Sequence, residues 1–261
     1  MTLQHRFRER LQSGAVALGC VVSFTDPAVS EAVAGAGLDF VWIDMEHGGL
    51  GVETTQRHIM ATQLAGASAL VRVPWNDPVL IKPVLDAGAD GVIVPLIRTP
   101  ADARNAVAAC RYPPEGVRGF GPRRPANYGR RGGPDFCQAA NRHVMVIPQI
   151  EHIDAVRSLD EILQTPGVEA VMIGPNDLSG SLGLLGQTGH PEVVGAIETV
   201  IEKARRHRVF VGIAVGRGAD DVLQWIGKGV QWVGVGADFL FMTRALDTEV
   251  ARIRQGLEQR G

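Results

Sequence analysis

The chain has 261 residues, of which 45% are hydrophobic and 21% are charged. This composition is typical of a globular protein and excludes a disordered, collagen-like or coiled-coil chain. The length suits a single α/β barrel, which takes about 250 residues. The formal net charge of −2 gives no reason to expect a nucleic acid or an anionic membrane as a partner.

Cysteine content and hydropathy indicate where the protein works. Cys20, Cys110 and Cys137 are too few, and odd in number, for a disulfide framework. No apolar run approaches the roughly 18 residues of a membrane span, and the polar first residues lack the apolar core of a signal peptide. We therefore expect a cytoplasmic protein without a membrane partner.

Short runs rich in Val, Ile and Ala alternate with helical patterns along the chain. The runs are apolar on both faces, which is typical of parallel strands that are covered on both sides. In chain order the pattern predicts strand 15–22, helix 27–36, strand 40–44, helix 53–66, strand 69–73, helix 77–88, strand 91–95, helix 100–111, strand 144–150, helix 153–164, strand 170–174, helix 191–207, strand 210–214, helix 219–228, strand 232–236 and helix 239–259.

Eight strands that alternate with helices predict a (β/α)8 TIM barrel, with residues 1–261 as a single domain. The alternative is a doubly wound sheet, but that fold would more often use fewer strands, and no GxGxxG opens the first helix. One long segment, 112–133, has no predicted element and is rich in arginine. A loop of this length is usually functional or disordered, so it could bind an anion or form a solvated surface. Arg123 is its candidate substrate-binding residue.

The active site of such a barrel lies at the carboxyl ends of the strands. Two carboxylates, Glu151 and Asp177, follow neighbouring strands, each after an apolar run where a lone charge is costly to bury. A shared divalent cation removes that cost, and oxygen ligands suit Mg²⁺ or Mn²⁺. Alternatively, each carboxylate caps a helix or pairs with an arginine.

Three further residues at strand ends can carry chemistry. Arg72 ends a buried strand and is suited to clamp a carboxylate or a developing enolate, although it could also form a structural ion pair. His47 lies three residues after Asp44, and a carboxylate that orients an imidazole is a general-base arrangement. The stretch 174–177 could present backbone N–H groups to an anion.

Lysine is scarce, and this bears on the reaction class. Of 26 basic residues only Lys82, Lys203 and Lys228 are lysine, and all three fall in predicted helices. Schiff-base catalysis requires a lysine inside the barrel. A metal-stabilised enolate is therefore the better hypothesis.

Several motifs together resemble the HpcH/HpaI aldolase family, and in particular its metal-dependent class II pyruvate aldolases. The resemblance covers roughly residues 14–248 in the family's order and spacing. The motifs are FVWIDMEHG at 40–48, RVPWND at 72–77, PVLDAGADGVIVP at 83–95, RYPPEGVRGFGP at 111–122, IPQIE at 147–151 and IGPNDLSGSLG at 173–183.

The resemblance implies a TIM barrel that reversibly cleaves a 4-hydroxy-2-oxo acid to an aldehyde and pyruvate or hydroxypyruvate. It implies a divalent metal (Mg²⁺, Mn²⁺ or Co²⁺) held by Glu151 and Asp177. Arg72 would contact the keto oxygen and stabilise the enolate. His47 would transfer protons, oriented by Asp44.

The resemblance also implies roles for residues around the substrate and between subunits. Asp86 would enter a neighbouring subunit's site, Gln149 would line the pocket, and backbone groups around Asn176 and Asp177 would hold the substrate carboxylate. The chain departs from the family's pattern at Val21, Asn176 and Ala214, which shape the pocket. The C-terminal helix, about 239–259, would be exchanged between subunits of a hexamer, a trimer of dimers.

Three alternatives stay open. GVGAD at 234–238 is similar to the phosphate-binding end of many barrels and would suit a phosphosugar isomerase or epimerase. That reading leaves Glu151, Asp177 and His47 without a shared purpose. The others are an acyl-CoA carbon–carbon lyase of the citrate-lyase β type and a barrel that only binds ligands.

Overall fold

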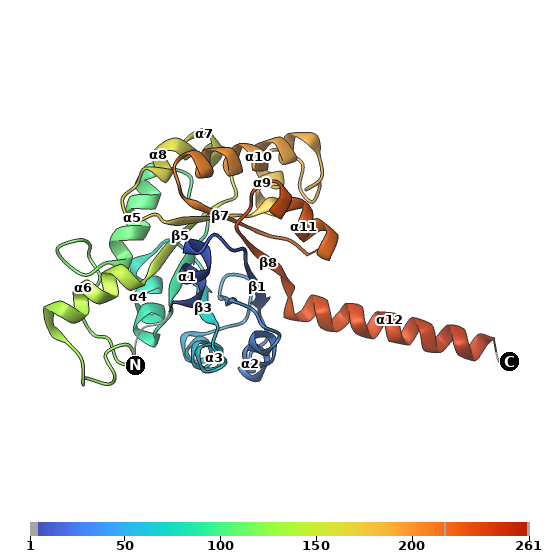
Figure 1. The fold of residues 1–261 in the computed structure, drawn as a ribbon, viewed down its shortest axis with the longest axis horizontal. Coiled ribbons are helices and arrows are strands. Elements are labelled where there is room, and N and C mark those ends of the chain that lie inside the picture. Colours follow the sequence, from blue (N-terminus) through green and yellow to red (C-terminus); the bar gives the residue numbers. More distant parts are fainter. Residues whose placement is uncertain (1–4, 217, 260–261) are drawn as a thin grey trace.

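Eight parallel strands form a closed barrel in the computed structural model, which describes residues 5–216 and 218–259. Each strand pairs with its neighbours in chain order, and β8 closes the barrel against β1. The predicted TIM barrel is thereby confirmed (Figure 1). The strands are β1 (Ala17–Val22), β2 (Phe40–Asp44), β3 (Ser68–Arg72), β4 (Gly91–Val94), β5 (Met145–Ile150), β6 (Ala170–Ile173), β7 (Phe210–Ala214) and β8 (Trp232–Ala237).

Helices surround the barrel, and most lie where the sequence predicts them. They are α1 (Arg6–Gln12), α2 (Ala28–Gly35), α3 (Val52–Leu64), α4 (Pro78–Ala87), α5 (Pro100–Cys110), α6 (Gly133–His143), α7 (Ile153–Arg157), α8 (Leu159–Leu163), α9 (Pro175–Ser181), α10 (Pro191–Arg206), α11 (Ala219–Gly227) and α12 (Asp238–Glu258). The single helix predicted at 153–164 is wrong, because Ser158 (φ −93°, ψ 12°) leaves the helical region and separates α7 from α8. The sequence pattern does not predict α1 or α6, and it offers α9 only as a helix or turn that opens at 174–177.

The barrel interior is a packed core. The large rings of Phe40 and Trp232 fill its amino end, and a Cβ atom at Gly19 or Gly212 would collide with them. Phe7 of α1 packs edge-on against both rings, with centroids 5.0 Å from Phe40 and 5.2 Å from Trp232. Helix α1 therefore closes the amino end, so the barrel opens only at the carboxyl ends of its strands.

Helix α12 leaves the body of the molecule. Its first residue, Asp238, is buried and accepts hydrogen bonds from the backbone N–H groups of Ser23 and Phe24. Beyond this anchor the helix projects away from the barrel (Figure 1). It carries an exposed apolar stripe, here called the α12 stripe: Phe239, Met242, Leu246, Val250, Ile253 and Leu257. Within the described ranges, no helix is both long and apolar enough to cross a bilayer.

Candidate active site

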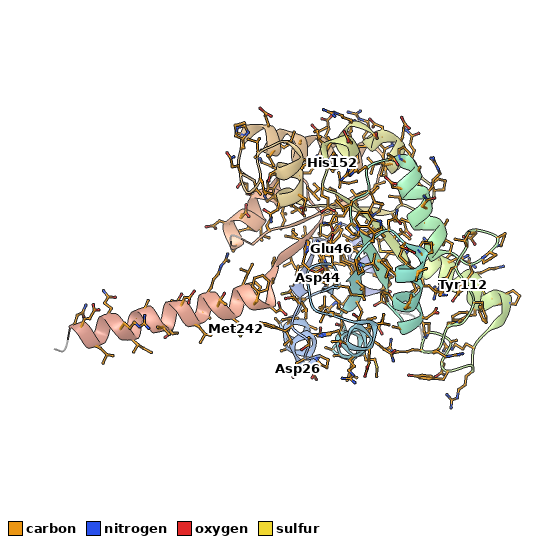
Figure 2. All side chains as sticks on the ribbon, turned by 180° about the vertical axis from the view of Figure 1, so that it is seen from behind. Asp26, Asp44, Glu46, Tyr112, His152 and Met242 are labelled. Atoms are coloured by element: carbon orange, nitrogen blue, oxygen red, sulfur yellow. The ribbon has the colours of Figure 1, made fainter. Side chains whose placement is uncertain are left out.

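Arg72 and Asp44 are the centre of a polar cluster at the carboxyl end of the barrel. They end β3 and β2 and lie opposite one another in the strand register. Arg72 donates from Nε and Nη2 to the two carboxylate oxygens of Asp44, at 2.9 and 2.6 Å. Its third nitrogen, Nη1, lies 2.9 Å from Oε2 of Glu46. Figure 2 shows Asp44 and Glu46 in the middle of the barrel.

Glu46 is a site residue to which the sequence analysis gives no role. Its position in DMEHG (44–48), two residues after the end of β2, is the sequence feature that could have identified it. Burial raises the pKa of its carboxyl group, the charge of Arg72 lowers that pKa, and the charges of Asp44 and Asp177 raise it further. Glu46 is therefore a partly buried carboxylate whose only close cationic partner among the described residues is Arg72, apart from His47 if its imidazole is protonated.

The predicted contact between Asp44 and His47 is not formed. Arg72 occupies both oxygens of Asp44, and Oδ1 also accepts from the backbone N–H groups of Glu46 and His47. The imidazole of His47 is 65% exposed, and the carboxylate near it is that of Glu46, 3.8 Å away. Asp44 orients Arg72 instead, because a charge-assisted fork across neighbouring strands is stronger than a bond to an exposed ring.

Glu151 is a buried carboxylate at the end of β5, only 2% exposed. Oε1 accepts the Leu96 backbone N–H at 2.7 Å, and Oε2 accepts from Nε2 of Gln149. Leu96 is held in the left-handed region at φ 53°, which costs about 1–3 kcal/mol and presents this N–H. Burial raises the pKa of Glu151 from 4.5 to about 7, against these two hydrogen bonds.

The position after β6 that faces Glu151 has no room for a side chain. A Cβ atom at Gly174, directly after β6, would lie 2.7 Å from Oε2 of Glu151. Gly174 thus allows the close approach of β6 to this carboxylate. Asp177 follows in the first turn of α9 and is exposed, and its charge contributes to the raised pKa of both Glu46 and Glu151.

The donor set fits a divalent cation that keeps several water or substrate ligands. Glu46, Glu151 and Asp177 interact electrostatically, and Arg72 is already bonded to Asp44. The described residues contain no group of three His, Cys, Asp or Glu side chains that could hold a metal. Two carboxylates leave about four positions of an octahedral ion open, as Mg²⁺ prefers.

The remaining pocket residues lie around this cluster. Gln149 is buried, and its Oε1 atom has no hydrogen-bond partner within the described structure. Asn176 is exposed at the start of α9. Ala214 ends β7 and packs against the interior cluster that holds Trp42. Val21 of β1 packs against the same cluster.

Two predicted site residues, Asp86 and Arg123, lie at the other end of the barrel in this subunit. Asp86 is near the end of α4 and pairs with Arg118 at 2.9 Å. Arg123 is exposed in the segment between α5 and α6. That segment borders a cavity of about 650 Å³ that is also lined by Ser68 and Asp90, at the amino ends of β3 and β4. A connection that leaves a helix leads to the amino end of the next strand, so Arg123 does not join Arg72 and Glu151 in its own subunit.

Comparison with known proteins agrees with the motifs. The family model described as HpcH/HpaI aldolase/citrate lyase matches residues 18–245. The chain belongs to this family. It is 36% identical over 254 residues to the 4-hydroxy-2-oxo-heptane-1,7-dioate aldolase of Escherichia coli, covering 96% of this chain and 95% of that one.

Solved structures of the family superpose closely. An HpcH/HpaI aldolase/citrate lyase family protein from Burkholderia cenocepacia has a TM-score of 0.91 at 34% identity, covering 96% of this chain and all of the other. The citrate synthase SbnG has a TM-score of 0.87 at 31% identity, covering 98% of this chain and 100% of that chain. Both likenesses span nearly the whole chain.

Proposed function

We propose that this family member is a divalent-metal-dependent carbon–carbon lyase. It would reversibly cleave 4-hydroxy-2-oxo acids to an aldehyde and pyruvate or hydroxypyruvate. The observation that carries the proposal is the buried Glu151 carboxylate beside Asp177, at the same barrel end as the Arg72 guanidinium. The aldolase name of the 36% identical relative supports the same reaction class.

Glu151 and Asp177 would hold the cation, with Gln149 and the Leu96 N–H fixing the Glu151 oxygens. A bound Mg²⁺, Mn²⁺ or Co²⁺ would supply a Lewis acid for the keto group of the substrate. The backbone N–H groups of Asn176 and Asp177 lie in the first turn of α9, where they lack intrahelical acceptors. They are the proposed donors to the substrate carboxylate.

Arg72 would stabilise the enolate. As the C3–C4 bond breaks, its electron pair moves toward C2 and negative charge gathers on the former keto oxygen. The guanidinium has five N–H donors, and the contacts with Asp44 and Glu46 leave a second N–H on both Nη1 and Nη2. The substrate oxygen would accept from such an N–H group while Asp44 keeps the fork in place.

His47 would move the proton. The C4 hydroxyl loses its proton to a base as the aldehyde forms, and C3 of the enolate later gains one to give the 2-oxo acid. The exposed imidazole lies beside Glu46, and from there it would serve both positions. Asp86 cannot assist within one subunit, so its proposed role requires a neighbouring subunit.

We further propose that residues 1–261 act as one domain in a homo-oligomer, a trimer of dimers, assembled through α12. The α12 stripe is exposed in the single chain, and burying it would remove a large apolar surface from water. The free thiols of Cys20, Cys110 and Cys137 support a cytoplasmic location.

The phosphosugar alternative is disfavoured by the surroundings of Asp238. Its carboxylate already accepts the backbone N–H groups of Ser23, Phe24 and Phe239, at 2.9 Å each. A phosphate group would need such donors at the end of β8. The protein's own carboxylate fills that position.

The proposed activity is tested by pyruvate release from a 4-hydroxy-2-oxo acid by EDTA-treated protein, with Mg²⁺, Mn²⁺ or Co²⁺ restored. Activity should return with metal and fall at least about 100-fold in Glu151→Gln. Asp160→Asn, on the exposed surface of α8, serves as the control and should keep its activity. Cleavage that survives metal removal would contradict the proposal.

A further inference from the structure

A second cavity, of about 380 Å³, begins beside the candidate active site. Asn176 and Ala214 line it at the barrel mouth, one residue from the proposed metal ligand Asp177. From there it is lined by Ile197 of α10 and by Trp225 of α11. The cavity, here called the side channel, thus leads outward from the mouth between these two helices.

The barrel mouth is asymmetric, and the side channel opens near the ends of β6 and β7 rather than beside Arg72. The ends of β2, β3 and β5 carry Asp44, Arg72 and Glu151, which the proposed reaction uses to hold the 2-oxo acid. The side of β7 and β8 carries small residues instead, with Ala214 next to Gly234. A molecule that reacts with the enolate has room to approach from this side.

The walls of the side channel are partly apolar and partly polar. Ile197 and Trp225 provide apolar surface, while Asp221 and Gln224 of α11 provide hydrogen-bonding groups. Lys228 also lines the channel, but its Nζ atom lies 2.7 Å from Oε1 of Glu198 and 4.8 Å from the Trp225 ring centroid.

The charged groups of Lys228 and Asp221 determine which charge a ligand in the side channel would meet. The Lys228 ammonium group is paired with Glu198, whereas Asp221 has no ion-pair partner within the described part of the chain. A carboxylate in the channel would therefore meet the negative charge of Asp221, and a hydroxyl group could donate a hydrogen bond to it.

We propose that the side channel binds the tail of the aldehyde and prefers an uncharged, hydroxylated tail to a carboxylate of the same length. This inference rests on the proposed aldolase function and names its acceptor class. A volume of 380 Å³ is at the small end of ligand pockets, which suits the tail of a small aldehyde. The relative from Escherichia coli, in contrast, is named for a dioate.

Two matched aldehydes test the proposal as acceptors for pyruvate with Mg²⁺: 4-hydroxybutanal and 4-oxobutanoate, which differ only at the terminal group. The wild type should use 4-hydroxybutanal with a kcat/KM about 10-fold higher. Asp221→Asn should bring the ratio close to one, since it removes the charge and keeps the shape. Asp220→Asn changes a neighbouring exposed carboxylate of the same helix and should leave the ratio unchanged.

A third variant tests the channel itself. Ala214→Leu should lower kcat/KM for both four-carbon aldehydes about 10-fold more than for glycolaldehyde, because the longer tails need the channel. A wild-type preference for 4-oxobutanoate, or a ratio that Asp221→Asn does not alter, would overturn the inference. Metal-dependent exchange of the pyruvate methyl protons, measured without any aldehyde, distinguishes failure of the proposed function from failure of the side-channel inference. If the wild type shows no exchange, the proposed function fails together with the inference.

Discussion

At the scale of single residues, the site depends on how carboxylates share Arg72. Strand positions alone predict Arg72, Glu151 and Asp177 at one end of the barrel, since the carboxyl ends of parallel strands meet there. The pair of Asp44 and Arg72 could not be seen in the local sequence, because Arg72 is distant in sequence but opposite Asp44 in the register. The role of Glu46 was missed for the same reason.

The fork between Arg72 and Asp44 should not tolerate lysine. In Arg72→Lys the side chain keeps its charge but cannot bond both Asp44 oxygens, so we expect about 1–3 kcal/mol of lost stability. Pyruvate release should fall about 100-fold or more. Urea unfolding and steady-state kinetics measure the two effects. Arg57→Lys, whose pair with Glu53 is exposed, is the matched control and should change stability by less than about 0.5 kcal/mol.

Burial of Glu151 gives the metal-free protein a distinct pH dependence. Its pKa rises from 4.5 to about 7 on folding, so the folded state binds more protons than the unfolded state between these values. Stability contributed by this group is therefore fully present below about pH 4.5 and is lost as pH rises to about 7. Glu151→Gln should stabilise metal-free protein by about 1–3 kcal/mol at pH 8, and by less at pH 5. Equal effects at both pH values, from urea titrations with EDTA, would contradict this account.

At the scale of elements, the alternation of apolar runs and helical patterns predicts all eight strands, because each strand is buried on both faces. Short helices carry little periodicity, so α7 and α8 merge in the prediction, and α9 is predicted only as a helix or turn. Arg123 follows a helix and so lies away from Arg72 and Glu151 in its own subunit. Contact of Arg123 with the substrate therefore stays a prediction that involves a neighbouring subunit.

Glycine is required at position 174, between β6 and α9, and this requirement can be tested. In Gly174→Ala the new Cβ would lie 2.7 Å from Oε2 of Glu151, so this carboxylate has to shift. We expect metal affinity, measured by calorimetric titration with Mn²⁺, to fall about 10–100-fold. Gly195→Ala in α10, where a Cβ meets nothing within 4 Å, should leave the affinity unchanged. Unchanged affinity in Gly174→Ala would mean that Glu151 is not a ligand.

At the scale of the whole molecule, the sequence predicts the barrel but not the course of α12. An apolar stripe shows that a helix buries one face, yet it does not show whether the covering surface belongs to the same chain. In the structure the α12 stripe is exposed, between 41% for Val250 and 64% for Leu257. The proposed exchange between subunits would cover it.

Assembly through α12 predicts the effect of charges on the stripe. The double variant Leu246→Asp and Ile253→Asp should reduce the oligomer to monomers, because two carboxylates cannot be buried unpaired in an apolar interface. Light scattering coupled to size exclusion measures the mass. Thr248→Asp, on the opposite face of α12, should keep the assembly of the wild type. A wild type that is monomeric at micromolar concentration would refute assembly through α12.

The central claim is that the carboxyl end of the barrel forms a metal-dependent enolate. The most direct measurement is exchange of the pyruvate methyl protons for deuterium, followed by NMR without an aldehyde. We predict exchange with Mg²⁺, none after EDTA treatment, and a loss of at least about 100-fold in both Glu151→Gln and Arg72→Lys. Exchange that persists without metal, or at the wild-type rate in Glu151→Gln, would contradict the account.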